Sequence, residues 1–270
     1  MTLVFLLLMS GCSAVKKSQF IKPSLALNSH PLEIENPQNK ILLIYNHGST
    51  SEDTTDPCFP NSSFLAGGMP SVVRSLAGKK IAEKDVVVYA FCSRIKGLQK
   101  TEDTPYNLKI RYRINEIVSV VKRFTDLGVV ADNIFLVGHS AGGWASLMIE
   151  ASNPNLVNSV IAFSPAFSGV KSRRNQQWQQ FRKDQERELQ SAEKIDALIY
   201  AFRRDAYNSL DDLSFFSEIS RVEYHPLSGK GDLHRCYRGH RAVFKSCFEA
   251  TQSATIIDFI ARQLKQDINL

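Results

Sequence analysis

From residue 40 onward, apolar and polar positions follow two alternating patterns. Short continuous apolar runs rich in Val, Ile and Leu are typical of strands that are buried on both faces of a parallel sheet. These runs cover residues 41–45, 85–91, 133–137, 159–163, 197–202 and 222–225. Between them lie stretches with apolar residues at helical spacing. They predict helices over residues 70–76, 106–127, 141–151 and 253–264.

This alternation predicts an α/β fold: a doubly wound, mostly parallel sheet flanked by helices. We expect this domain to span residues 38–270. One strongly polar segment, residues 171–194, interrupts the alternation between the fourth and fifth strands. We interpret it as a small helical insertion over the edge of the sheet, at about residues 170–195.

Composition narrows the functional classes. The chain has 270 residues, of which 43% are hydrophobic and 22% charged, as is ordinary for a globular protein. The net charge of +6 is moderate, and no zinc-finger spacing, aromatic RNA-binding signature or long basic tail accompanies it. We therefore expect no nucleic-acid partner. No CxxC pair or Cys/His cluster has metal-ligand spacing, so we expect no metal.

The strongest chemical motif is Gly-His-Ser-Ala-Gly-Gly at residues 138–143. It matches G-x-S-x-G, and a predicted strand enters it while a predicted helix leaves it. Such a tight turn holds the serine in a strained conformation with its hydroxyl exposed at the edge of the sheet. The N-terminus of the following helix adds a partial positive potential where negative charge develops in acyl transfer. Ser140 is therefore the candidate nucleophile.

With these elements and this motif, residues 38–266 resemble the α/β-hydrolase superfamily, whose esterases and lipases typically carry GHSAGG. The chain looks nearer the dienelactone-hydrolase-like and short-chain esterase groups than groups with a large cap. The resemblance implies a carboxylesterase-like serine hydrolase that acts on small-molecule acyl esters through an acyl-enzyme intermediate, with no cofactor.

The resemblance also implies an oxyanion hole made of two backbone N–H groups. One belongs to the residue after the nucleophile, Ala141. The other belongs to the loop after an early strand, where we assign Ser49, with Gly48 as the flexible approach and Thr50 as the alternative donor. We interpret His47 as a structural residue.

In this family the acid and the histidine follow the nucleophile in that order. Asp205 lies three residues past the predicted strand that ends at residue 202, and Asp211 and Asp212 are alternatives. His240 follows a glycine and leads toward the last helix, as is typical of the family, and His234 is the alternative base.

Arginines are frequent around these histidines, at positions 235, 238 and 241. They fit either a solvated basic loop or the recognition of an anionic substrate group.

The N-terminus resembles a bacterial lipoprotein signal. An apolar run over residues 3–9, too short to span a bilayer, precedes Ser10-Gly11-Cys12. The resemblance implies that residues 1–11 form a signal peptide and that Cys12 is lipidated. Residues 12–37 would then form a tether. We therefore expect an exported protein, anchored to a membrane of the cell envelope and facing the periplasm or the exterior.

Four cysteines remain if Cys12 carries lipid. Disulfides persist in exported proteins. We expect a bond between Cys236 and Cys247, which are close in sequence and bracket the candidate histidine, and a second between Cys58 and Cys92.

Two other functions remain open at this point. A peptidase or amidase of the same fold would share the elbow and the triad. A non-catalytic lipoprotein that uses the fold as a binding module is the alternative from a different class.

Overall fold

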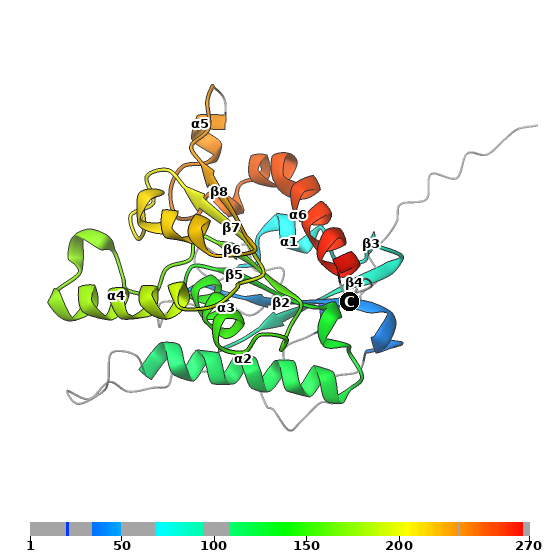
Figure 1. Ribbon diagram of the computed structural model, residues 1–270. Helices are drawn as coiled ribbons and strands as arrows, with labels where there is room; N and C mark the ends of the chain where they lie inside the picture. Colours follow the sequence, from blue (N-terminus) through cyan, green and yellow to red (C-terminus); the bar gives the residue numbers. More distant parts are fainter. Residues whose placement is uncertain (1–19, 22–33, 50–67, 94–107, 232, 267–270) are drawn as a thin grey trace, which may run out of the picture.

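The computed structural model describes residues 20–21, 34–49, 68–93, 108–231 and 233–266. Its centre is an eight-stranded, mostly parallel sheet in the order β1-β4-β2-β5-β6-β7-β8 (Figure 1). The short strand β3 pairs with β4 in the antiparallel direction. The strands are β1 (Phe20–Ile21), β2 (Lys40–Asn46), β3 (Lys80–Ile81), β4 (Lys84–Phe91), β5 (Ile134–His139), β6 (Ser159–Phe163), β7 (Ala197–Phe202) and β8 (Val222–Leu227).

The central strands are buried because helices cover both faces of the sheet. In β5, β6 and β7 every residue is buried, which explains their continuous apolar runs. The predicted fold class is confirmed, and six of the eight strands lie where apolar runs predicted them. The two-residue strands β1 and β3 were not predicted, since they are too short to give a pattern.

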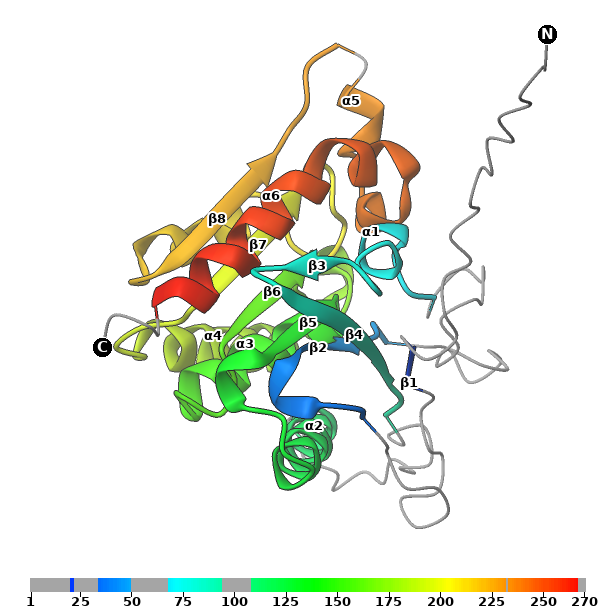
Figure 2. The same ribbon diagram turned by 90° about the vertical axis from the view of Figure 1, so that its right-hand side faces the viewer.

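The helices form two layers, one on each face of the sheet, and an apolar core lies between each layer and the sheet. Helices α2, α3 and α4 pack on one face of the sheet, and α1 and α6 pack on the other (Figure 2). A short helix, α5, follows the last strand. The helices are α1 (Ser71–Arg74), α2 (Leu108–Asp126), α3 (Ala141–Ser152), α4 (Gln176–Gln190), α5 (Leu233–Cys236) and α6 (Ser246–Gln266). The described residues also form the 3-10 helices η2 (Pro37–Asn39), η4 (Ala131–Asn133), η5 (Lys171–Arg173), η6 (Asp211–Glu218) and η7 (Ala242–Phe244).

One helix starts earlier than the sequence indicated, and the polar helical segment has a clear place in the fold. Helix α6 begins at Ser246, seven residues before the expected start, and buries Phe248 completely. The polar segment expected to form an insertion contains α4, which lies between the parallel neighbours β6 and β7. A parallel pair needs a crossover connection. Helix α4 therefore forms part of the crossover that packs against the sheet layer, beside α3.

Because the central strands are parallel, their carboxyl ends meet at one edge of the sheet, where ligands bind in open α/β folds. The ends of β5, β7 and β8 all lie at this edge, so residues far apart in sequence can form a common site there. Within the described ranges, no helix is long and apolar enough to cross a membrane.

Candidate active site

Ser140 occupies a strained turn between β5 and α3. Its backbone has φ 54° and ψ −121°, a conformation that residues with a side chain rarely adopt. Neighbouring backbone groups hold the turn. The Ser140 N–H donates to the carbonyl of Phe163 at 3.0 Å, and its carbonyl accepts from the N–H groups of Trp144 and Ala166. Such strain persists only where the surrounding structure enforces it.

The glycines of the motif allow α3 to approach the sheet closely. A Cβ atom on Gly142 would lie 2.1 Å from the carbonyl oxygen of Asn46, at the end of β2. A Cβ atom on Gly138 would lie 2.4 Å from the backbone nitrogen of Gly143. Both contacts are with backbone, which cannot move aside, so glycine is required at these two positions.

The Ser140 hydroxyl begins a chain of hydrogen bonds across three segments. His240 Nε2 lies 2.7 Å from Ser140 Oγ, and His240 Nδ1 lies 2.8 Å from Asp205 Oδ2. The Asp205 side chain is almost fully buried. Because a carboxylate only accepts hydrogen bonds, Nδ1 carries the imidazole proton and donates it to Asp205, which leaves Nε2 to accept from the serine hydroxyl.

The structure therefore brings Ser140, Asp205 and His240 together, and it leaves the alternative residues elsewhere. His234 is exposed and contacts the Arg203 guanidinium instead. Asp212 accepts from Lys171 Nζ at 2.7 Å. Asp211 is exposed at the start of η6.

The two expected oxyanion donors belong to different segments of the chain. Ala141 is the first residue of α3, and the first N–H groups of a helix have no acceptor within the helix. Ser49 is exposed and follows Gly48, whose added Cβ would lie 3.1 Å from Ser140 Cβ. The alternative donor, Thr50, lies outside the described residues.

A buried network fixes the backbone before Ser49. The Arg113 guanidinium of α2 donates to the His47 carbonyl at 2.5 Å, and Arg113 is only 2% exposed. The His47 ring contacts the Gly48 carbonyl through Nδ1 at 2.6 Å and accepts from the Ser93 N–H at 3.3 Å. His47 thus has a structural role, as we predicted from the sequence.

Sequence reasoning missed Tyr207 and His139, which hold the histidine and the acid. The Tyr207 N–H donates to Asp205 Oδ1 at 2.8 Å, and its ring packs against the His240 ring at a tilt of 33°, with centroids 4.1 Å apart. His139 Nε2 donates to the His240 carbonyl at 2.9 Å, and burial lowers the pKa of His139 to about 3, so this ring is neutral. Tyr207 lies two residues after Asp205, which is the one signal that could have identified it.

The polar helical segment also contributes to the site. Arg174 donates to Asn208 Oδ1 at 2.9 Å and to the Tyr207 carbonyl. Arg174, which lies outside the sheet, therefore holds the loop that follows Asp205.

Comparison with known proteins identifies the fold. The family model described as "Putative esterase" matches residues 81–204, which include Ser140 but end one residue before Asp205. A fungal esterase from Rhizomucor miehei matches with 13% identity and a TM-score of 0.54, covering 86% of this chain and 78% of that one. The chain has the α/β-hydrolase fold. No curated protein matches it.

Two further solved structures share this α/β-hydrolase fold. Est1E from Butyrivibrio proteoclasticus matches with 16% identity and a TM-score of 0.50, covering 87% of this chain and 91% of that one. A prolyl endopeptidase matches with 12% identity and a TM-score of 0.53 over 86% of this chain. This chain spans about a third (35%) of the length of that endopeptidase. The match to the esterase family model supports hydrolase activity for this chain.

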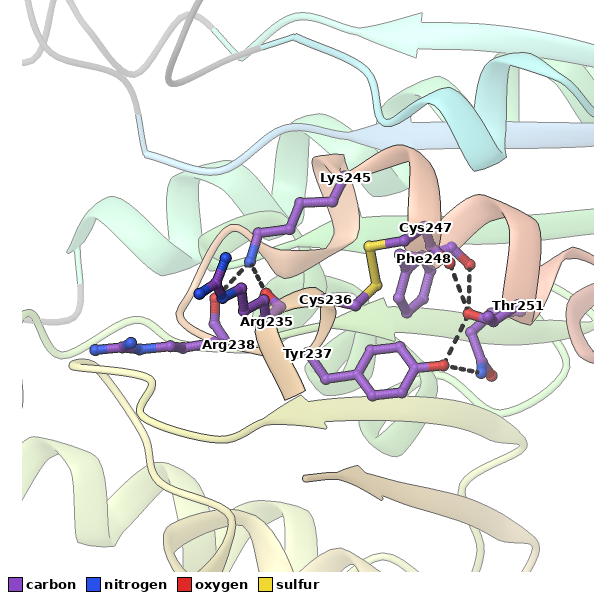
Figure 3. Close-up of a disulfide and its surroundings, with 9 residues drawn as sticks. Arg235, Cys236, Tyr237, Arg238, Lys245, Cys247, Phe248 and Thr251 are labelled. Carbon is purple, nitrogen blue, oxygen red and sulfur yellow. Dashed lines mark hydrogen bonds between the residues drawn. A yellow bond between two sulfur atoms is a disulfide. The ribbon is translucent and has the colours of Figure 1, made fainter. Parts of the chain in front are cut away.

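The segment that carries His240 is cross-linked. The predicted Cys236–Cys247 disulfide is present, with Cα atoms 5.9 Å apart, and it joins α5 to α6 on either side of His240 (Figure 3). Cys58 lies outside the described residues, so its bond to Cys92 stays a prediction. Cys12 also lies outside them.

Within the described ranges, no group of three His, Cys, Asp or Glu side chains is placed to hold a metal.

Proposed function

We propose that the protein is a serine hydrolase that cleaves carboxylic esters through an acyl-enzyme intermediate, with Ser140 as the nucleophile. The observation that carries this proposal is the hydrogen-bond chain from Ser140 through His240 to Asp205, with distances of 2.7 and 2.8 Å. A nucleophile, its base and the group that orients the base stand within hydrogen-bond reach, as acyl transfer requires.

Each residue has a defined step. His240 Nε2 removes the proton from Ser140 Oγ as this oxygen attacks the ester carbonyl. Asp205 stabilises the imidazolium that forms, and the Ala141 and Ser49 N–H groups stabilise the tetrahedral oxyanion. The intermediate then expels the alcohol, which takes the proton from His240. Water, deprotonated by His240, hydrolyses the acyl-serine and releases the acid.

A screen with chromogenic p-nitrophenyl esters of increasing acyl length tests the proposal. We expect hydrolysis by the wild type, loss of at least about a thousandfold in kcat for Ser140→Ala, and an unchanged circular dichroism spectrum. Equal turnover by Ser140→Ala would contradict the proposal.

A peptidase or amidase is the second candidate, because a prolyl endopeptidase shares this fold. The matching p-nitroanilides separate the two functions. If the anilides are cleaved with higher kcat/KM than the esters, the enzyme is an amidase or peptidase that uses the same residues.

We further propose that the protein is exported and anchored through lipid at Cys12. The proposal rests on the apolar run and the Ser10-Gly11-Cys12 sequence that follows it. Globomycin or Cys12→Ser should block processing at this cysteine, as followed by mass spectrometry of the membrane fraction. Recovery of the protein in the cytoplasm with residues 1–11 intact would contradict it.

A further inference from the structure

Four arginines gather around the two segments that carry the acid and the histidine of the site. We call them the arginine cluster: Arg203, Arg204, Arg235 and Arg238. The first two follow β7 and directly precede Asp205, and the other two precede His240 on α5 and the turn after it. Three of the four are exposed, and Arg203 is partly buried.

The backbone places the two halves of the cluster side by side. Arg203 forms a parallel bridge with Arg238, and the Gly239 N–H donates to the Arg203 carbonyl at 2.8 Å. Desolvation and the charges of Arg204 and Arg238 lower the pKa of Arg203. The positive charges of Arg204 and Arg238 therefore act on the Arg203 guanidinium.

This positive charge is not neutralised within the described part of the chain. The ion pairs there are formed by other cations, and no carboxylate pairs with a member of the cluster. The His234 ring lies against the Arg203 guanidinium. An imidazole is either neutral or positively charged, so His234 does not compensate the arginines; desolvation and the surrounding arginines lower its pKa, which favours the neutral form. Like charges held together cost free energy that a bound anion would recover.

The cluster also stands on a rigid support. Lys245 Nζ donates to the Arg235 carbonyl at 2.6 Å and to the Arg238 carbonyl at 3.1 Å, and the Cys236–Cys247 disulfide closes the same segment. Figure 3 shows the two arginine side chains extending away from this disulfide. A support fixed before binding reduces the entropy that is lost when a ligand is bound.

We propose that the arginine cluster binds a negatively charged group of the substrate, a phosphate or a carboxylate, so that the preferred esters carry an anionic group away from the bond that is cleaved. This inference rests on the proposed function. Guanidinium groups bind both anions with paired, charge-assisted hydrogen bonds. A substrate fits better than a distant partner because Arg204 adjoins Asp205 and Arg238 lies two residues from His240. An anion bound there also increases the local concentration of the ester at Ser140.

A matched pair of esters tests the proposal: mono-p-nitrophenyl glutarate, which carries a carboxylate, and the neutral p-nitrophenyl valerate. We expect the wild type to prefer the glutarate by at least about tenfold in kcat/KM, equivalent to about 1.4 kcal/mol, with a smaller preference in high salt. In the double variant Arg204→Gln, Arg238→Gln the preference should fall to near one, while kcat/KM for the valerate stays unchanged.

The control variant Arg111→Gln, Lys122→Gln removes the same charge from exposed positions on α2 and should keep the preference. A second readout is independent of turnover: inorganic phosphate should raise the pKa of His234, followed by NMR at constant ionic strength.

Equal preference in the wild type and the Arg204/Arg238 variant would overturn the proposal. The proposal would also be overturned if the Arg204/Arg238 variant kept the preference for glutarate but no longer bound phosphatidylglycerol vesicles. That result would assign the cluster to a membrane surface. Valerate hydrolysis that depends on Ser140 without any preference for glutarate would refute the anion site alone and leave the proposed function intact.

Discussion

Glu150 should make the protein less stable as pH rises, and replacing it with glutamine should remove that effect. This residue of α3 is only 3% exposed, and its Oε2 atom has no hydrogen-bond partner among the described residues. The neighbouring Asp196 forms ion pairs with Lys194 and Arg221. Burial, reinforced by the Asp196 charge, raises the pKa of Glu150 from 4.5 to about 8.

The sign of the effect follows from proton binding. Between pH 4.5 and about 8 the folded state holds a proton that the unfolded state releases, so the free energy of unfolding falls as pH rises through this interval. One pKa unit corresponds to about 1.4 kcal/mol, so the shift to about 8 sets an upper limit of about 5 kcal/mol. The contribution of neutral Glu150 to the free energy of unfolding is fully present below pH 4.5, and it is lost as pH rises through the folded-state pKa of about 8.

Urea unfolding of the wild type and Glu150→Gln at several pH values measures this difference. Near pH 4.5 the two proteins should have similar stability, and near pH 8 the variant should be more stable by up to several kcal/mol. Glu188→Gln, on the exposed surface of α4, is the matched control and should follow the wild type throughout. A stability difference between Glu150→Gln and the wild type that does not change with pH would refute the reasoning.

Three other changes test the support of the site. Tyr207→Ala should lower kcat about fivefold to tenfold and change the pH profile, because its ring packs against His240 and such ring contacts contribute about 1 kcal/mol, whereas Tyr207→Phe should retain activity. Breaking the Cys236–Cys247 bond, which spans 11 positions, should cost about 3 kcal/mol and reduce activity at reductant concentrations that leave circular dichroism unchanged; simultaneous loss of both would contradict its local role. Gly142→Ala should yield inactive or insoluble protein, because the new Cβ would lie 2.1 Å from a backbone oxygen, and normal ester turnover would contradict this.

The sequence predicted those features that depend on neighbouring residues. Fully buried parallel strands leave continuous apolar runs, and the Ser140 elbow is a local pattern between a strand and a helix, so both could be found in advance. The preference for His240 over His234 rested only on the glycine that precedes His240, because both histidines lie in the same polar segment. It is decided by the contact of His240 with Asp205, 35 positions away.

Contacts between distant segments explain the other omissions. His139 occupies the variable position of the elbow motif, and its bond to the His240 carbonyl spans 101 positions. Arg113 reaches the His47 carbonyl across 66 positions. Neither residue type, helix spacing nor burial pattern indicates such partners. The faces of α4 that pack inward could not be read from its strongly polar sequence, although the helix buries Leu189 and Gln185.

Covalent labelling with a fluorophosphonate probe tests the central claim most directly, since only an activated serine reacts. Intact-mass measurement of the wild type should show one phosphonyl adduct, and peptide mapping should place it on Ser140. Ser140→Ala should remain unlabelled while keeping its fold, and His240→Ala should react far more slowly because the base is lost. Equal labelling of Ser140→Ala, or an adduct on another serine of the folded wild type, would contradict the account.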